Sequence, residues 1–252
     1  MIKRVALFYV LTFLLTIVLG GLQEATSFAR SWATVTLPQL APGLAALAML
    51  GLFRRDGLRL SLSLRGVSAW RALGALLAPA AVAAVVFILL RPDVGGLPAP
   101  LWLMLPGMAL GAFGEEVGWR GYLHRRLDPH LQPLASSALV GVLWALWHVG
   151  LYGNGPVYML CLVLLMVAYS TVLYGLLKGT RFNVWVAAAF HLGINLGNLP
   201  FLAVINDTAF MAVNALIWTA VAAVVVIRRR DLFRRQSATA STAGEPAAAP
   251  TG

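Results

Sequence analysis

Gly114-Glu115-Glu116-Val117-Gly118-Trp119-Arg120 is the stretch around which the chain is organised, and it lies inside an apolar run that begins at Leu101. It places two adjacent carboxylates at membrane depth. A charged side chain at the centre of a bilayer costs about 2.5–3.5 kcal/mol, so ionisable residues within spans are candidates for function. The rest of the chain is interpreted as the scaffold for this stretch.

Composition points to a membrane protein. The 252 residues are 60% hydrophobic and only 11% charged, with a mean hydropathy of +0.82. A soluble domain cannot bury so much apolar surface, so we expect a polytopic protein in contact with lipid. The net charge of +10 does not indicate a nucleic-acid partner, because the basic residues cluster between apolar runs, where they face a membrane surface. Cys161 is the only cysteine, which excludes a disulfide within the chain.

Eight apolar segments each approach the roughly 20 residues that a helix needs to cross a bilayer. They are Val5–Leu22, Leu37–Phe53, Trp70–Leu90, Leu101–Gly121, Leu134–Tyr152, Val157–Leu177, Val184–Leu202 and Ala209–Ile227. The predicted fold class is therefore all-α, with about eight transmembrane helices in a single domain over residues 1–235. Residues 236–252 lack hydrophobic periodicity and are predicted to be a disordered cytoplasmic tail.

Lysine and arginine alternate between the two sides of the predicted bundle. They gather in both terminal flanks and in every second loop, whereas the opposite loops hold only Arg30 and Arg91. The positive-inside rule then places both termini in the cytoplasm. Arginine outnumbers lysine and alanine is abundant, as in GC-rich bacteria, so the expected location is a bacterial cell membrane.

A helical wheel at 100° per residue separates the two glutamates. One narrow stripe holds Gly107, Gly111, Gly114, Gly118 and Gly121. Glu115 borders this stripe, where a substrate backbone could come close. Glu116 points to nearly the opposite side with Arg120 one turn further on, which predicts a structural i, i+4 ion pair.

Two further polar pairs interrupt apolar segments at i, i+4 spacing: Trp144 with His148, and His191 with Asn195. The depths of Glu115 and His191 along their segments predict a site in the cytoplasmic half of the bilayer, whereas His148 fits that depth less well. A lone membrane histidine is usually a packing residue, and a lone asparagine usually joins helices. The set as a whole favours function.

His124 and His130 lie at or beyond the cytoplasmic end of the fourth segment and are interpreted as surface residues.

Three motifs in order carry a resemblance to a known family. They are Glu115-Glu116-Val117-Gly118-Trp119-Arg120, Trp144-Ala145-Leu146-Trp147-His148 and His191-Leu192-Gly193-Ile194-Asn195. Over residues 101–200, the expected protease core, the sequence resembles the CPBP intramembrane protease family. That family includes type II CAAX prenyl endopeptidases and bacterial bacteriocin-processing or self-immunity proteins. Trp144 stands where phenylalanine is commoner in the family.

The resemblance implies hydrolysis of a peptide bond within the membrane. Glu115 would be the general base that activates water, and Asn195 would stabilise the oxyanion. His148 and His191 would hold that water or a metal ion. The four residues could ligate Zn²⁺, but a metal-free glutamate mechanism is equally open, because the chain has no H-E-x-x-H motif.

Two other classes of function stay open. A proton-coupled transporter also places Glu, His and Arg in spans, although no inverted repeat is visible. A non-catalytic immunity or scaffold protein is the second alternative. The expected partners are the lipid bilayer and a peptide or protein substrate, with no nucleic acid. A prenylated C-terminus, a bacteriocin leader and a membrane-protein segment all remain compatible, and the oligomeric state is open.

Overall fold

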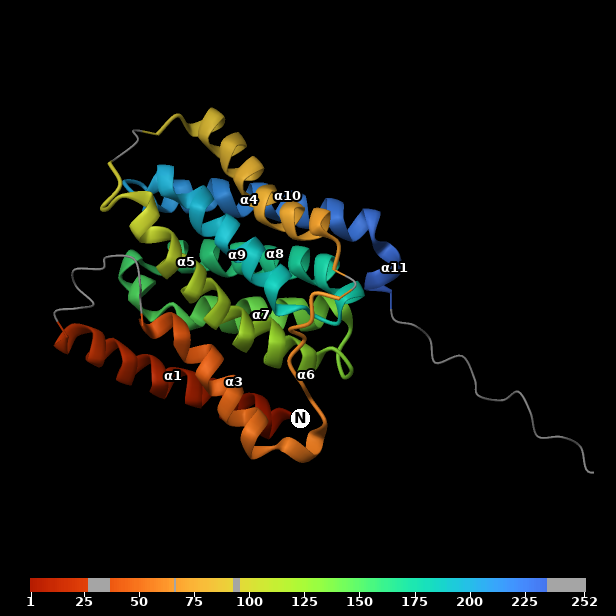
Figure 1. Cartoon of the computed structure of the whole chain (residues 1–252). Helices are drawn as coiled ribbons and strands as arrows, with labels where there is room; N and C mark the ends of the chain where they lie inside the picture. The colour runs from red at the N-terminus through yellow and green to blue at the C-terminus, as the bar shows by residue number, and fades with distance from the viewer. Residues whose placement is uncertain (27–36, 66, 93–95, 235–252) are drawn as a thin grey trace, which may run out of the picture.

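The computed structural model describes residues 1–26, 37–65, 67–92 and 96–234 (Figure 1). Within these ranges the chain is helical without strands, which confirms the predicted all-α class. The main helices are α1 (Ile2–Ala25), α3 (Ala41–Leu52), α4 (Ala69–Leu90), α5 (Leu101–Glu116), α7 (Pro133–Trp147), α8 (Pro156–Leu177), α9 (Val184–Asn198) and α10 (Thr208–Arg228). Each of the eight apolar segments coincides with one of them. The predicted tail 236–252 and Arg30 lie outside the described residues.

Short elements join the long helices. They are the 3-10 helices η1 (Leu37–Leu40), η2 (Arg54–Asp56), η4 (Val149–Asn154), η5 (Lys178–Thr180) and η6 (Leu199–Phe201), the π-helix η3 (Val117–His124), and the short α6 (Arg125–Leu127) and α11 (Arg230–Phe233). In the described residues, five helices are long and apolar enough to cross a membrane: α1, α4, α8 with η5, α9 with η6, and α10. The number of spans stays a prediction, because the remaining helices are shorter.

Side chains at several helix starts accept hydrogen bonds from backbone N–H groups that the first turn of a helix leaves unpaired. Ser68 accepts a hydrogen bond from the backbone N–H of Arg71 at the start of α4, and Asn183 accepts two from the first turn of α9. Proline occupies the first position of α7 and α8, where its missing N–H removes one unpaired donor.

The helices surround α8 and α9. Helix α8 packs against α7 and α10, and α9 packs against α4 and α5, while α1 and α3 form a pair on one flank (Figure 1). Burial follows this order, since 72% of the apolar window of α8 is buried but only 11% of that of α1. The exposed face of α1 presents apolar residues such as Leu14 and Ile17, as expected of a helix that meets lipid.

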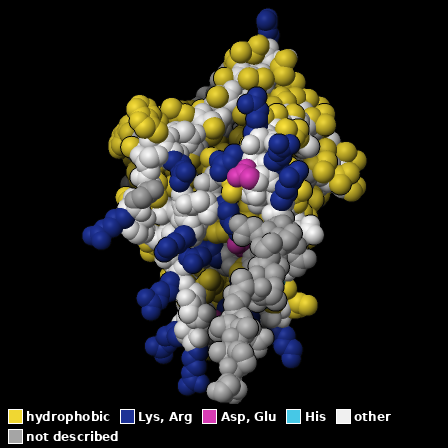
Figure 2. Space-filling model, turned by 90° about the vertical axis from the view of Figure 1, so that its right-hand side faces the viewer, with side chains coloured by type: hydrophobic (Ala, Val, Ile, Leu, Met, Phe, Trp, Pro, Cys, Tyr) yellow, Lys and Arg dark blue, Asp and Glu magenta, His cyan; other side chains and the backbone are white. Residues whose placement is uncertain are grey.

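Basic residues gather at one end of the bundle. Figure 2 views this end and shows Lys and Arg side chains spread across it. Asp56 pairs with both Arg4 and Arg126, and Asp128 pairs with Lys178 at 2.6 Å, so three loops and the N-terminus meet here. The alternation of charge in the sequence is thus reproduced in space. This arrangement is the one that the positive-inside rule associates with a cytoplasmic face.

The glycine stripe of α5 packs against the chain's own backbone. A Cβ built on Gly118 would lie 2.6 Å from the carbonyl oxygen of Pro42, and one on Gly111 would lie 2.2 Å from Oε1 of Gln39. The expectation of an open, substrate-binding glycine face beside Glu115 was therefore wrong, because η1 and the first turn of α3 fill it. A wheel of one helix cannot show what fills its grooves.

The fourth segment also changes its helix type. After Glu116 the chain forms a π-helix that runs through His124. The i→i+5 hydrogen bonds of a π-helix make its turns wider than those of an α-helix. Gly121 therefore leaves the stripe and faces Leu60 and Val184 instead. His124 is fully buried rather than on the surface, with the rings of Tyr174 and Phe182 at 5.4 and 5.1 Å. His124 is buried because the helix continues past Glu116 and places this side chain against Tyr174 near the end of α8. His130 is exposed, as expected.

The fifth segment ends earlier than the predicted Tyr152. Helix α7 stops at Trp147, and His148 has the non-helical angles φ −76° and ψ 56° before the chain enters η4. His148 therefore lies where the chain turns away from the axis of α7, so a depth calculated along an ideal helix does not apply to it.

Replacing Gly118 by alanine should destabilise the fold, because the new Cβ would collide with the backbone of Pro42. Overpacking of this kind costs about 1–3 kcal/mol. Thermal unfolding in detergent should show a lower midpoint for Gly118→Ala. The matched control is Gly74→Ala in α4, where nothing lies within 4 Å of the added atom. A Gly118→Ala midpoint equal to that of the control would contradict this packing.

Candidate active site

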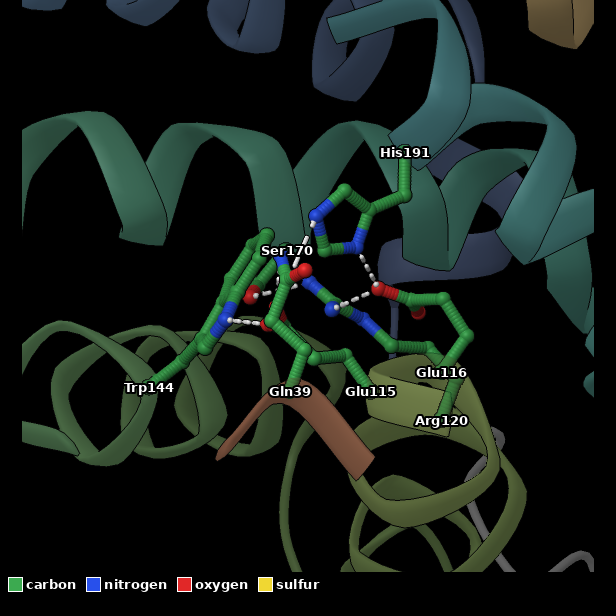
Figure 3. Close-up of polar contacts among 7 residues, drawn as sticks. All are labelled: Gln39, Glu115, Glu116, Arg120, Trp144, Ser170 and His191. Atoms are coloured by element: carbon green, nitrogen blue, oxygen red, sulfur yellow. Dashed lines mark hydrogen bonds and ion pairs between the residues drawn. The ribbon is translucent and has the colours of Figure 1, made fainter. Parts of the chain in front are cut away.

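Two buried glutamates at the end of α5 form the centre of the site (Figure 3). Glu115 is 2% exposed and Glu116 is fully buried. The carboxylate of Glu115 accepts one hydrogen bond on each oxygen: Nε2 of Gln39 donates to Oε1 at 3.1 Å, and Nε1 of Trp144 donates to Oε2 at 2.8 Å. Two neutral donors thus fix the orientation of this carboxylate without forming an ion pair with it.

Gln39 was missed in the sequence analysis. It belongs to η1, which starts the second apolar segment, and the tight glycine packing brings it against α5. One signal was available, since an isolated glutamine among Leu, Pro and Ala residues is unusual in a span. Its contact with Glu115 was not predictable, because 76 residues separate the two positions.

Glu116 uses one oxygen to hold two partners. Its Oε1 accepts from Nη1 of Arg120 and from Nδ1 of His191, each at 2.8 Å. The expected i, i+4 contact with Arg120 is present. The prediction that Glu116 points away from the other site residues was wrong. Helix α9 reaches across and inserts His191 between the two glutamates, a contact that the spacing along α5 cannot reveal.

Arg120 is fully buried and has partners from three helices. Besides Glu116, it donates through Nη2 to Oγ of Ser170 on α8 at 3.1 Å. Its guanidinium also lies over the Trp144 ring, 4.2 Å from the centroid. A cation over an aromatic face is stabilised by the ring's negative quadrupole. The charge of Arg120 is therefore compensated by an anion, a hydroxyl and an aromatic face.

The hydrogen-bond partner of His191 determines which of its ring nitrogens carries the proton. A carboxylate oxygen only accepts, so Nδ1–H of His191 donates to Glu116 and, in the neutral ring, Nε2 carries the lone pair. That Nε2 lies 4.0 Å from Oε1 of Glu115. Glu116 and Glu115 thus lie on the two sides of one imidazole.

His148 is held in the same tautomer by a different group. Its Nδ1 lies 2.8 Å from the backbone carbonyl oxygen of Trp144, which can only accept, so Nδ1 carries the proton. In the neutral ring, Nε2 is then the unprotonated nitrogen. Trp144 therefore supports two site residues, since its indole N–H binds Glu115 and its carbonyl orients His148.

All four predicted catalytic residues line one cavity of about 210 Å³. The cavity is bounded by Glu115, His148, His191 and Asn195, together with apolar side chains of α8 and α10. It continues to Leu151 in η4 and to Asn206 in the turn after α9, at the end of the bundle away from the basic loops. The sequence analysis placed the site in the cytoplasmic half from the depths of Glu115 and His191, whereas this cavity extends toward the opposite end of the bundle. The depth argument did not include the loop residues that line it there, such as Leu151 and Asn206.

The residues present do not fit a metal ion in this arrangement. Two imidazole Nε2 atoms and a carboxylate are donors that Zn²⁺ accepts. Across the described ranges, however, no group of three or more His, Cys, Asp or Glu side chains is arranged so that it could hold a metal ion. In addition, each oxygen of the Glu115 carboxylate already accepts a hydrogen bond, from Gln39 or from Trp144.

Comparison with known proteins identifies a family whose model matches the part of the chain that holds the three motifs. Residues 97–197 match the family described as Type II CAAX prenyl endopeptidase Rce1-like. CAAX prenyl protease 2 of Methanococcus maripaludis is 27% identical over 139 residues, which cover 51% of this chain and 51% of that protein. Lysostaphin resistance protein A of Staphylococcus aureus is 27% identical over 206 residues, which cover 75% of this chain and 48% of that protein. The chain spans about half the length of these relatives.

Residues 97–197 form an Rce1-like segment. This confirms the resemblance drawn from the three motifs, all of which lie inside the segment. Gln39 lies outside this segment. The orientation of the Glu115 side chain therefore also depends on η1, which the family match does not cover.

Replacing Arg120 by methionine should strongly destabilise the protein, because it leaves the Glu116 carboxylate buried with only His191 as partner. Breaking a buried ion pair from one side costs about 3–5 kcal/mol. Adding Glu116→Gln to Arg120→Met should recover a large part of that loss, since the buried charge is then gone. Thermal unfolding in detergent of the two single variants and the double variant provides the cycle. Additive losses in the double variant would contradict a direct pairing.

Proposed function

We propose that this chain is an intramembrane endopeptidase of the CAAX type, in which Glu115 activates water for attack on a peptide bond. The observation that carries the proposal is the 4.0 Å separation of Glu115 Oε1 from His191 Nε2. A water molecule about 2.8 Å from each atom fits this gap and can donate one proton to each. Its lone pair is then free to attack a carbonyl carbon.

Glu115 takes the proton as the attack proceeds, as a general base does. Gln39 and Trp144 keep the carboxylate aimed at the cavity, and neither donor competes for its charge as a cation would. Glu116 acts indirectly. By accepting Nδ1–H of His191 it keeps the Nε2 lone pair directed at the water, so Glu116 and Arg120 are positioning residues.

Asn195 and His148 complete the proposed chemistry on the other walls of the cavity. The side-chain N–H₂ group of Asn195 can donate to the carbonyl oxygen as it becomes an oxyanion, which stabilises the tetrahedral intermediate. When the C–N bond breaks, the amine nitrogen leaves with a proton that Glu115 had received. His148 can hydrogen-bond the substrate carbonyl or the water through Nε2, depending on its protonation.

The transporter alternative is less well supported. Residues 97–197 match a family of endopeptidases, and the sequence shows no inverted repeat of the kind that many transporters have. The name of one relative, lysostaphin resistance protein A, leaves room for an immunity role. For this chain we propose peptide maturation, self-immunity or regulated cleavage of a membrane-associated protein in a bacterial cell membrane.

Cells that express wild-type protein should contain new peptide termini that are absent from cells expressing Glu115→Gln at matched levels. The substitution preserves shape and removes the base, so cleavage should stop while folding persists. A mass-spectrometric survey of membrane-protein termini is the measurement. Glu24→Gln, at the exposed end of α1, is the matched control and should give the wild-type pattern. Identical termini in wild type and Glu115→Gln would favour the non-proteolytic alternatives.

Trp144→Phe should lower the cleavage rate by at least tenfold, because it keeps an aromatic ring over Arg120 but deletes the donor to Glu115; general base catalysis contributes roughly 10²–10⁴-fold. The rate of appearance of a terminus found in the survey is the measurement. Trp185→Phe, which loses a hydrogen bond to the backbone carbonyl of Leu62 and contacts none of the site residues, serves as control. Equal rates for the two variants would argue against a catalytic effect of the Trp144 donor.

Activity should be insensitive to metal removal, because no step of the proposed mechanism passes through a metal ion. Purified protein treated with 1,10-phenanthroline and dialysed should cleave at the untreated rate, and elemental analysis should find far less than one Zn²⁺ per chain. Loss of activity that stoichiometric Zn²⁺ restores would show that the site rearranges to bind metal.

A further inference from the structure

A second cavity lies at the basic end of the bundle, away from the candidate active site. It has a volume of about 380 Å³ and is lined by Arg4 of α1 and by residues 51–56, which form the end of α3 and η2. These residues lie outside the three motifs and outside the cavity beside Glu115. Figure 1 shows the N-terminus beside the end of α3, and Figure 2 shows the basic side chains that cover this end.

Guanidinium groups outnumber carboxylates at this second cavity. Arg4, Arg54 and Arg55 line it, and among its described lining residues Asp56 is the one acid. The carboxylate of Asp56 already pairs with Arg4 and with Arg126. Within the part of the chain that the structure describes, Arg54 and Arg55 have no acidic partner. The cavity therefore carries two positive charges that the protein does not compensate.

An exposed apolar stripe of α3 leads along the outside of the bundle to this cavity. The residues of the stripe are Leu44, Leu47, Ala48, Gly51 and Leu52. From the first to the last of them the helix rises about 12 Å. One leaflet of a bilayer holds roughly 15 Å of hydrocarbon, which is half of the core. The stripe is therefore long enough for an acyl chain to lie along it, with the cavity at the end where a headgroup would be.

Two glycines shape the junction between the stripe and the arginines. A Cβ built on Gly51 would meet no other atom within 4 Å, so the surface is open at this point. Gly57 ends η2 in the left-handed conformation, with φ 68°, which glycine adopts without steric cost. The chain can therefore leave the axis of α3 directly after η2. This turn keeps Arg54 and Arg55 beside the end of the stripe.

We propose that this second cavity binds the headgroup of an anionic glycerophospholipid from the leaflet at the basic end, with Arg54 and Arg55 pairing its phosphate. The stripe of α3 contacts an acyl chain of the same lipid. Guanidinium groups suit this role because they bind phosphate oxygens through two parallel hydrogen bonds. A soluble phosphate ester would use the arginines but not the stripe. A zwitterionic headgroup carries its own cation, which weakens its attraction to two arginines.

Helix α3 connects the proposed lipid site to the buried glutamates. Its first turn packs against Gly118, and η1, which precedes it, carries the Gln39 side chain that donates to Glu115. A lipid bound at the far end of α3 therefore stabilises the helix that holds Gln39 in place. Because a ligand of the folded state shifts the unfolding equilibrium, the bound lipid should also raise the temperature of unfolding.

Lipid binding to the whole chain, purified in detergent, tests the proposal. Phosphatidylglycerol and phosphatidylcholine with the same acyl chains are added, bound lipid is counted by native mass spectrometry, and the thermal midpoint is recorded. Phosphatidylglycerol should bind and raise the midpoint more than phosphatidylcholine does. The double variant Arg54→Gln/Arg55→Gln should bind phosphatidylglycerol roughly 20-fold more weakly, since each basic residue at an anionic surface contributes a factor of about five.

The matched control is the double variant Arg65→Gln/Arg71→Gln. Both arginines are exposed and lie outside the cavity, and their replacement removes the same amount of charge. This variant should bind phosphatidylglycerol nearly as the wild type does. Equal losses in the two double variants would show a general attraction of anionic lipid to a basic surface, and would overturn the assignment of a site. None of these residues takes part in the proposed cleavage, so this test and the terminal survey fail independently.

Two further measurements separate a lipid from a soluble phosphate ester. Gly51→Leu fills the open surface at the end of the stripe and should weaken phosphatidylglycerol binding while leaving the midpoint without lipid unchanged. Gly74→Leu, at an equally open position of α4, is the control and should bind as the wild type does. Glycerol 3-phosphate, which has the phosphate but no acyl chain, should not raise the midpoint. A rise equal to that with the lipid, or unchanged lipid binding by Gly51→Leu, would overturn the proposal.

Discussion

The shared oxygen of Glu116 is the interaction on which the rest of the site depends. It accepts hydrogen bonds from Arg120 and from His191, all of them buried, and so links the end of α5 to α9. A buried charge without partners would cost several kcal/mol. Because Arg120 is also held by Ser170 on α8, three helices are fixed to one another by a single network.

This network explains how two adjacent glutamates differ. Glu116 faces a cation and is neutralised, whereas Glu115 meets only the neutral donors of Gln39 and Trp144. In the first arrangement, the cation of Arg120 balances the buried negative charge of Glu116. The second leaves a carboxylate held by two neutral donors at the edge of the cavity. His191 connects the two, with one nitrogen toward each carboxylate.

The packing of small residues makes this arrangement possible. The glycines of α5 allow the backbone of η1 and α3 to approach closely, which inserts Gln39 at the depth of Glu115. A larger residue at Gly111 would displace the glutamine side chain. Close approach of backbones through small residues is a general device of membrane helices, where van der Waals contact replaces the hydrophobic effect. Here the same close packing also brings Gln39 into hydrogen-bond contact with Glu115.

By itself the sequence determined the helical class, the positions of the apolar segments, the gathering of basic loops at one end and the residues of the three motifs. These depend on composition and on spacing along one helix, which are local properties. Only the tertiary structure decided that Gln39 and Trp144 hold Glu115, that His191 lies between both glutamates, that His124 is buried, and that the cavity opens away from the basic loops. Some of these outcomes depend on contacts between residues of different helices. Others follow from the changes of helix geometry after Glu116 and Trp147. The hydrophobic period of a single segment contains information about neither.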